Sequence, residues 1–145
     1  MNEKNILLIE DNEGDVVLML EAFGAQKAGN HIHVTRDGQE AIMFLSKKED
    51  FKASPTPDVI ILDLNLPKMD GKEVLKYIKG NFDMKSIPFV IFTTSSSAKY
   101  IKECYDCNAN CYVVKPDDFS KFQDAIQTIE HFWATTVKLN RTKTN

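Results

Sequence analysis

Acidic residues follow two apolar runs of this sequence, at positions where a buried strand would end. Glu10 and Asp11 follow the run ILLI, and Asp63 follows the run VIIL. A carboxylate at the end of a buried strand is costly unless a cation or a hydrogen-bond donor compensates its charge. Two more polar side chains follow later apolar runs: Thr93 comes after FVIF, and Lys115 comes after YVV. These five side chains combine acids, a hydroxyl and a primary amine.

This set of residue types suits chemistry on a phosphoryl group. Carboxylates in close contact repel each other by about 4 kcal/mol per pair at an effective dielectric near 20, so a cluster of acids needs a cation. Hard carboxylate oxygens suit Mg²⁺, which also shares phosphate oxygens. Lysine and threonine can contact further phosphate oxygens, and a carboxylate can be the phosphorylated nucleophile. We therefore expect Asp63 to be a nucleophile whose charge is balanced by Mg²⁺ and Lys115.

The surrounding elements must bring these side chains together. Four apolar runs without polar alternation and one weaker run predict five strands, most of them covered on both faces. Between them, apolar residues three and four positions apart predict helices. This alternation indicates an α/β fold with a parallel sheet, in which the carboxyl ends of the strands form the functional edge. The predicted strands are Ile6–Ile9, Ile32–Thr35, Val59–Leu62, Phe89–Phe92 and Tyr112–Val114, and the predicted helices lie within Val16–Ala28, Gln39–Lys47, Lys72–Lys79, Ala98–Tyr105 and Phe119–Trp133.

Composition narrows the class of protein. The chain has 145 residues, of which 43% are hydrophobic and 27% are charged, which is typical of one globular domain. A net charge of −3 argues against binding to nucleic acid or to a membrane surface. The first apolar run is too short for a signal peptide or a membrane span, and three cysteines make no disulfide framework. We expect a cytoplasmic protein with one domain over residues 1–137 and a flexible tail over residues 138–145.

The order of the motifs resembles the receiver domain of bacterial two-component response regulators. The resemblance covers about residues 4–133 and depends on Glu10-Asp11, the segment DLNLPKMDG that starts at Asp63, Thr93, and YVVKP from Tyr112 to Pro116. It implies a flavodoxin-like (βα)5 fold, a doubly wound parallel sheet of five strands in the order 2-1-3-4-5. It also implies that a histidine kinase transfers a phosphoryl group to Asp63. The chain would then be a phosphoacceptor in a phosphorelay that catalyses only its own phosphorylation and dephosphorylation.

The resemblance implies a metal site at the same edge. Glu10, Asp11, Asp63 and the backbone carbonyl of Asn65 would hold Mg²⁺. Glu10 departs from the pattern, because many receivers have aspartate there. The extra methylene group should still allow contact with the metal.

The remaining roles concern the phosphoryl group and its readout. By resemblance, Thr93 and Lys115 would contact the phosphoryl oxygens. Tyr112 would be an aromatic switch that turns inward when Thr93 moves. Asn65 and Ser95 would tune the lifetime of the phosphorylated state.

The C-terminal part is similar to a subgroup of the family. The segment DDFSKFQDAIQTIEHFW resembles small stand-alone regulators that pair with bacterial phytochrome kinases. The implied partners are a sensor histidine kinase, of the phytochrome class in this subgroup, and a histidine phosphotransfer protein. No output-domain motif follows Trp133, so we expect output by protein contacts. These include a homodimer through the face formed by the helix Ala98–Tyr105, the strand Tyr112–Val114 and the helix from Phe119.

Two other functions remain open at this point. A phosphohydrolase that works through an aspartyl phosphate would need a second aspartate two residues after the nucleophile. Asn65 stands there instead and cannot protonate a leaving group. A scaffold that uses the receiver fold without phosphate would have no need to keep Asp63, Thr93 and Lys115 together.

Single residues also have structural interpretations. Glu10-Asp11 could be acids at a helix N-terminus, and Tyr112 could be a half-buried strand aromatic without a switching role. The spacing of Cys104, Cys107 and Cys111 resembles a metal motif. The three cysteines span a helix end and a strand start, which favours half-buried thiols.

Overall fold

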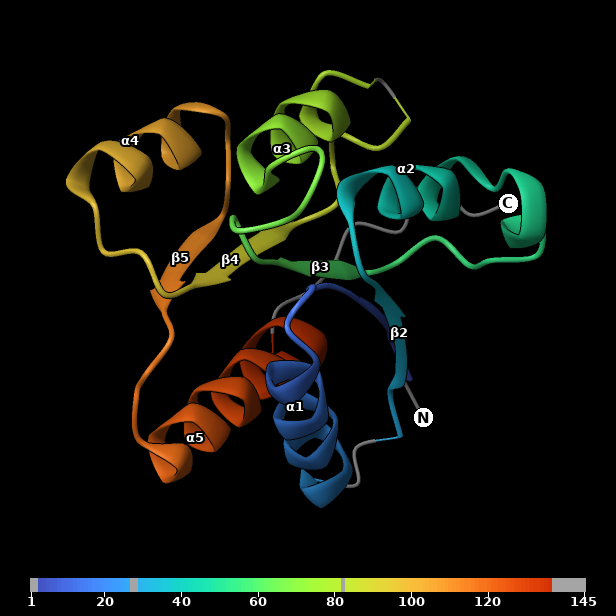
Figure 1. The fold of residues 1–145 in the computed structure, drawn as a ribbon. Helices are drawn as coiled ribbons and strands as arrows, with labels where there is room; N and C mark the ends of the chain where they lie inside the picture. Colours follow the sequence, from blue (N-terminus) through green and yellow to red (C-terminus); the bar gives the residue numbers. More distant parts are fainter. Residues whose placement is uncertain (1–2, 27–28, 82, 137–145) are drawn as a thin grey trace.

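The computed structural model describes residues 3–26, 29–81 and 83–136. Five parallel strands form one sheet in the order β2-β1-β3-β4-β5 (Figure 1). This confirms the predicted α/β fold and strand order. The predicted tail, 138–145, lies outside the described residues. The strands are β1 Asn5–Ile9, β2 His31–Thr35, β3 Val59–Leu62, β4 Phe89–Thr93 and β5 Cys111–Val114.

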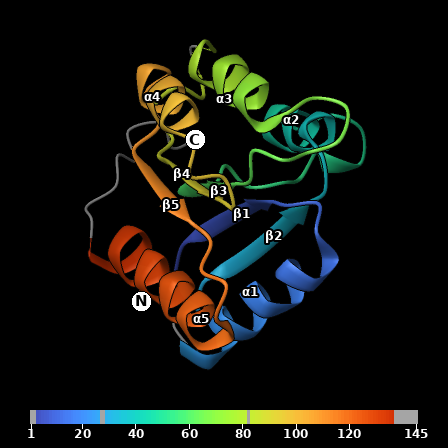
Figure 2. The same cartoon turned by 60° about the vertical axis from the view of Figure 1, so that its left-hand side comes forward.

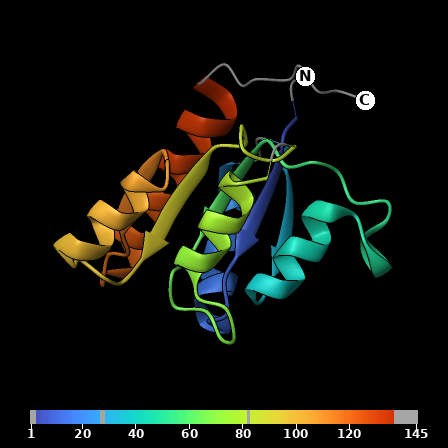
Figure 3. The same cartoon turned by 90° about the horizontal axis from the view of Figure 1, so that it is seen from above.

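Helices cover both faces of the sheet. Figures 1 and 2 show α1 and α5 side by side on one face, and Figure 3 shows α2, α3 and α4 in a row across the other. Each helix layer closes its own hydrophobic core against the sheet. The helices are α1 Glu13–Gln26, α2 Gly38–Ser46, α3 Gly71–Lys79, α4 Ala98–Asp106 and α5 Phe119–Ile129, with a 3₁₀ turn η1 Glu49–Phe51 and a π-helix η2 Glu130–Thr136.

Burial explains why some strands are easier to predict than others. The central strands β1, β3 and β4 are almost completely buried, and their sequences are accordingly runs of apolar residues. The edge strands β2 and β5 are mostly half-buried. One side of each edge strand faces solvent, so the sequence of β2 predicts a strand only weakly.

The helix that follows β3 is fixed close to Asp63. Asp70 caps α3, because its side chain accepts the Glu73 N–H at 3.1 Å and the Glu73 side chain accepts the Asp70 N–H at 3.1 Å. A Cβ atom on Gly71 would lie 2.5 Å from the carbonyl oxygen of Asp63. Glycine at this position therefore allows α3 to begin directly against the end of β3.

Among the described residues, two helix boundaries differ from the predicted ones by more than one residue. The first helix begins at Glu13 rather than at Val16, because Asn12 Oδ1 accepts the Asp15 N–H at 2.9 Å and stabilises a polar first turn. The last helix changes from α-helical to π-helical hydrogen bonding at Glu130. No helix within the described ranges is long and apolar enough to cross a membrane.

Candidate functional site

The ammonium group of Lys115 joins acids from three elements at the carboxyl edge of the sheet. Lys115 Nζ lies 2.8 Å from Glu10 Oε1, 3.1 Å from Asp63 Oδ2 and 2.7 Å from Asp15 Oδ2. Glu10, Asp63 and Lys115 are 1%, 6% and 7% exposed, respectively. Glu10, Asp63 and Lys115, each more than 50 positions from the next in sequence, thus meet in one buried charged cluster at the predicted edge of the sheet.

Burial and mutual contact shift the ionisation of this cluster. Burial, together with the charge of Asp63, raises the pKa of Glu10 to about 7 despite the hydrogen bond from Lys115. Burial alone would lower the pKa of Lys115, but hydrogen bonds to Asp15 and Glu10 raise it above the ordinary lysine value. Three acids contact one ammonium group, so ionisation of all three leaves negative charge in excess.

The donor types at this edge fit a hard divalent cation. Glu10 and Asp63 offer carboxylate oxygens, and Asp11 is exposed beside them. Asp63 Oδ1 also accepts the Asn65 N–H at 3.1 Å, which places Asn65 at the exposed rim of the site. Within the described ranges, no three His, Cys, Asp or Glu side chains already form a metal-binding group. A cation would therefore share Glu10 and Asp63 with Lys115.

Thr93 brings an unsatisfied hydroxyl to the same edge. It is fully buried at the end of β4, and its Oγ1 has no hydrogen-bond partner among the described residues. Its carbonyl accepts the Lys115 N–H at 2.7 Å, so the two residues are neighbours. A buried hydroxyl without a partner costs about 1–3 kcal/mol. A bound anion that accepts a hydrogen bond from the Thr93 hydroxyl would offset this cost.

Tyr112 on β5 pairs with Ile91 on β4, two residues before Thr93. The Tyr112 ring packs against the core beneath α2–α4, and its hydroxyl donates to the Ser95 carbonyl at 2.8 Å. The ring therefore points inward, toward this core. Asn65 Nδ2 approaches Thr94 Oγ1 at 3.4 Å, which links the loops after β3 and β4.

Asp15 is the one residue of the cluster that the sequence analysis missed. A helix start at Val16, the position favoured by apolar spacing, leaves Asp15 in a loop without an assigned position. The signal is present in the segment DNEGD, since asparagine is a favoured helix N-cap. A helix start at Asn12 places Asp15 one turn from Asp11, on the side of the acids.

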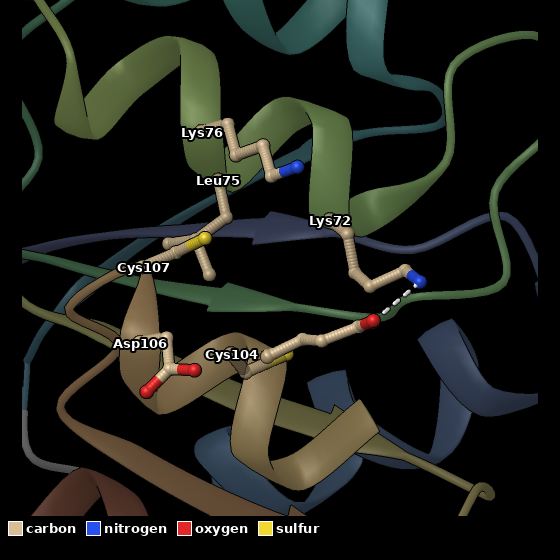
Figure 4. Close-up of a pocket in the computed structure, with 7 residues that line it drawn as sticks. Lys72, Leu75, Lys76, Cys104, Asp106 and Cys107 are labelled. Atoms are coloured by element: carbon tan, nitrogen blue, oxygen red, sulfur yellow. Dashed lines mark hydrogen bonds and ion pairs between the residues drawn. The ribbon is translucent and has the colours of Figure 1, made fainter. Parts of the chain in front are cut away.

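A shallow cavity opens beside the charged cluster and a second one lies away from it. The first, about 290 Å³, includes Asp15, Thr94, Lys115 and Phe119 in its lining, and it gives access to the cluster from between α1 and α5. The second, about 260 Å³, lies between α3 and α4 and is bridged by the ion pair of Lys72 with Glu103 at 2.8 Å (Figure 4).

The three cysteines do not gather at one place. Cys104 and Cys107 line the α3–α4 cavity (Figure 4), whereas Cys111 packs against the core on the opposite face of the sheet. All three are free thiols, one buried and two half-buried. Burial raises the pKa of Cys104 to about 11. This arrangement agrees with the structural interpretation of the motif.

Comparison with known proteins gives a consistent result. Residues 6–127 match the model of the response regulator receiver domain. The response regulator Rcp1 of Synechocystis is 40% identical over 136 residues, which cover 94% of this chain and 92% of Rcp1. Its Mn²⁺-bound crystal structure superimposes with a TM-score of 0.90, covering 94% of this chain and 99% of that one.

Two other solved structures are also similar. The phosphorylated cyanobacterial phytochrome response regulator RcpA is 39% identical with a TM-score of 0.91, over 94% of this chain and 98% of that one. The bacteriophytochrome response regulator AtBRR is 38% identical with a TM-score of 0.74, over 95% of this chain and all of that one. The chain therefore belongs to the response regulator receiver domain family.

Proposed function

We propose that Asp63 accepts a phosphoryl group from a sensor histidine kinase and that this modification changes the protein-binding surface of the chain. The observation that carries the proposal is the buried contact of Asp63 Oδ2 with Lys115 Nζ at 3.1 Å. The nucleophile Asp63 is thus in contact with the ammonium group of Lys115. The backbone N–H of Lys115 in turn donates to the carbonyl of Thr93, whose hydroxyl has no partner among the described residues. Phosphoryl transfer requires mainly such positioning and charge stabilisation.

The chain's own residues account for the main steps of transfer. The Asn65 N–H holds Asp63 Oδ1, which orients the carboxylate. An Asp63 oxygen then forms a bond to phosphorus while the bond from phosphorus to the donor histidine nitrogen breaks. Lys115 and Thr93 would donate to the phosphoryl oxygens as their charge increases.

We infer that Mg²⁺ is the cofactor, held by Glu10, Asp11, Asp63 and the backbone carbonyl of Asn65. When bound, the metal supplies charge neutralisation for the transferring group. The excess of acids over ammonium groups at this edge supports a cation. The Mn²⁺-bound form of Rcp1 supports a divalent one.

The output we propose is a change of protein contacts. Phosphorylation adds about −1.5 to −2 charges beside Thr93, and the response would pass through Thr93 to Tyr112. We assign the inward Tyr112 ring to the phosphorylated arrangement, and Asn65 and Ser95 to control of its lifetime. The implied catalysis is limited to phosphorylation and dephosphorylation of the chain itself.

The partners follow from the family and the subgroup. We propose a cytoplasmic sensor pathway with a histidine kinase of the phytochrome class and, as a second partner, a histidine phosphotransfer protein. Phytochrome regulators among the similar structures support this assignment. The chain would act as one receiver domain over residues 1–137, and its homodimer would use the α4-β5-α5 face. Nucleic acid and membrane are not among the proposed partners.

Intact mass spectrometry with acetyl phosphate tests this function. The wild type should gain one phosphoryl group in Mg²⁺ and none after chelation with EDTA. Asp63→Asn should gain none under either condition, while Asp124→Asn, an exposed acid on α5, should behave like the wild type. If Asp63→Asn becomes modified to the same extent as the wild type, Asp63 is not the acceptor.

A further inference from the structure

The phenol of Tyr105 on α4 lies at the edge of the sheet, against β5. β5 is an edge strand, so alternate N–H groups along it point away from β4. The Lys115 N–H points toward β4, because it donates to Thr93 at 2.7 Å. The Tyr112 N–H, three positions earlier, therefore points outward. The Tyr105 hydroxyl oxygen accepts this N–H at 3.0 Å.

Tyr112 is consequently held at two points. Its backbone N–H is bound to Tyr105 on α4, and its side-chain hydroxyl is bound to the Ser95 carbonyl at 2.8 Å in the loop before α4. Both partners are on the segment that connects β4 to the end of α4. The two hydrogen bonds therefore fix both the backbone and the ring of Tyr112 relative to this segment.

These bonds continue toward the phosphorylation site. Asn65 donates its backbone N–H to Asp63 Oδ1 at 3.1 Å and approaches Thr94 Oγ1 through Nδ2 at 3.4 Å. Thr94 precedes Ser95, whose carbonyl holds the Tyr112 hydroxyl. A series of polar contacts thus runs from Asp63 to Tyr105, which is 47% exposed on the outer surface.

We propose that Tyr105 is a positioning residue for the switch, which holds Tyr112 in its inward arrangement by accepting the outward N–H of β5. This inference rests on the proposed function, because it assigns the inward arrangement to the phosphorylated form. If Tyr105 stabilises that form, linkage requires that its removal weaken binding at Asp63 by the same factor. The loss of one neutral hydrogen bond corresponds to about a fivefold change.

The test compares Tyr105→Phe with Tyr77→Phe. Both variants lose one phenolic hydroxyl from a tyrosine that is about half exposed, but the hydroxyl of Tyr77 has no hydrogen-bond partner among the described residues. Hydrogen exchange by NMR reports the Tyr112 amide directly. Titration with beryllium fluoride in Mg²⁺, a phosphoryl mimic, reports affinity at Asp63 through the amide signals of residues 93–95.

We expect Tyr105→Phe to accelerate exchange of the Tyr112 amide about tenfold and to raise the beryllium fluoride concentration for half-saturation about fivefold. Tyr77→Phe should change neither quantity. Unchanged exchange at Tyr112 would overturn the inference, because the phenol would then not protect this N–H. Faster exchange with unchanged half-saturation would also overturn it, since Tyr105 would then only cover the strand edge.

Failure of the proposed function has a different signature. In that case the wild type itself would not bind beryllium fluoride, and Asp63→Asn would give the same spectrum as the wild type. The proposed role of Tyr105 in the switch would then be wrong together with the proposed function. The amide exchange of Tyr112 would still show whether the hydrogen bond to Tyr105 exists.

Discussion

At the scale of single residues, the charged cluster reflects a conflict between stability and function. Glu10 is buried against Asp63, and both depend on one lysine. Buried carboxylates in contact are costly because desolvation and repulsion both oppose ionisation. A site that accepts a phosphoryl group and a divalent cation needs these charges. The cluster is therefore expected to be a place where removing charge stabilises the fold.

The substitution Glu10→Gln tests this conflict between stability and function. The amide oxygen can still accept the Lys115 hydrogen bond, and only the bond from the Asn12 N–H at 3.1 Å is lost. The buried charge and its repulsion with Asp63 are gone. We expect the free energy of unfolding in metal-free buffer to rise by about 1 kcal/mol, with loss of Mg²⁺-dependent phosphorylation. Urea denaturation followed by circular dichroism measures the first effect.

Glu13→Gln is the control, because Glu13 is exposed and pairs with Arg36 at the surface at 3.2 Å. It should change the free energy of unfolding by less than about 0.5 kcal/mol. A Glu10→Gln variant less stable than Glu13→Gln would show that the Glu10 charge is favourable where it lies.

Cys104 provides a prediction that depends on pH. Burial raises the pKa of its thiol to about 11, so the thiolate that reacts with alkylating agents is disfavoured in the folded protein. At pH 8 the thiolate fraction is on the order of one in a thousand. Iodoacetamide should leave Cys104 unmodified in the native protein, and its reaction should accelerate as the pH rises toward 11.

Peptide mass spectrometry after alkylation identifies the modified cysteine. The same protein in denaturant should react at all three cysteines, which controls for reagent quality. Native alkylation of Cys104 at pH 8 as fast as in denaturant would contradict its assignment as a buried, protonated thiol.

At the scale of elements, the strands that are most completely buried are the ones that the sequence predicts most clearly. The central strands were predicted well because both of their faces are covered and their sequences carry no polar interruption. The start of α1 was wrong because its polar first turn depends on the Asn12 cap rather than on apolar spacing. The π-helical end at Glu130 was not predictable from periodicity. Tertiary contacts at Glu130 include its acceptance of the Asn30 side-chain N–H at 2.8 Å.

Two glycine substitutions should have opposite effects on stability, one where α3 begins against β3 and one in the open interior of α1. Gly71→Ala would place a Cβ atom 2.5 Å from the Asp63 carbonyl oxygen, and we expect it to lower the free energy of unfolding by about 2 kcal/mol. Gly24→Ala lies inside α1 with no atom within 4 Å of the added Cβ. It should raise stability by about 0.5–1 kcal/mol through helix propensity.

Urea denaturation of both variants beside the wild type provides the measurement. Equal stability of the two variants would mean that α3 can move away from Asp63 at little cost. The position of the acceptor would then not depend on the close approach of Gly71.

At the scale of the whole molecule, topology explains why the order of residues along the chain predicts the site. A parallel sheet in the order 2-1-3-4-5 brings the ends of β1, β3, β4 and β5 to one edge, so residues 10, 63, 93 and 115 lie at that edge. The contact of Asp15 with Lys115 cannot be derived in this way, because it depends on where one helix begins. The unpartnered hydroxyl of Thr93 likewise depends on side-chain packing that the strand order does not specify.

The proposed homodimer makes a prediction about the two faces of the molecule. Val114 on β5 and Val17 on α1 are 40% and 48% exposed, but only Val114 is on the α4-β5-α5 face. Phosphorylation by acetyl phosphate should increase the apparent mass on size exclusion with light scattering. Val114→Lys should prevent this increase because it buries a charge in an apolar contact, while Val17→Lys should not. Loss of association in Val17→Lys alone would place the dimer on the other face.

The central claim, that Asp63 is the phosphoryl acceptor, is tested most directly by locating the modification. Protein phosphorylated with acetyl phosphate in Mg²⁺ would be reduced with borohydride, which converts an acyl phosphate to an alcohol, and the peptides would be sequenced by mass spectrometry. We predict the reduced residue at Asp63, with Glu10, Asp11 and Asp15 unchanged. Reduction at one of those three acids, or at none of the four, would contradict the account.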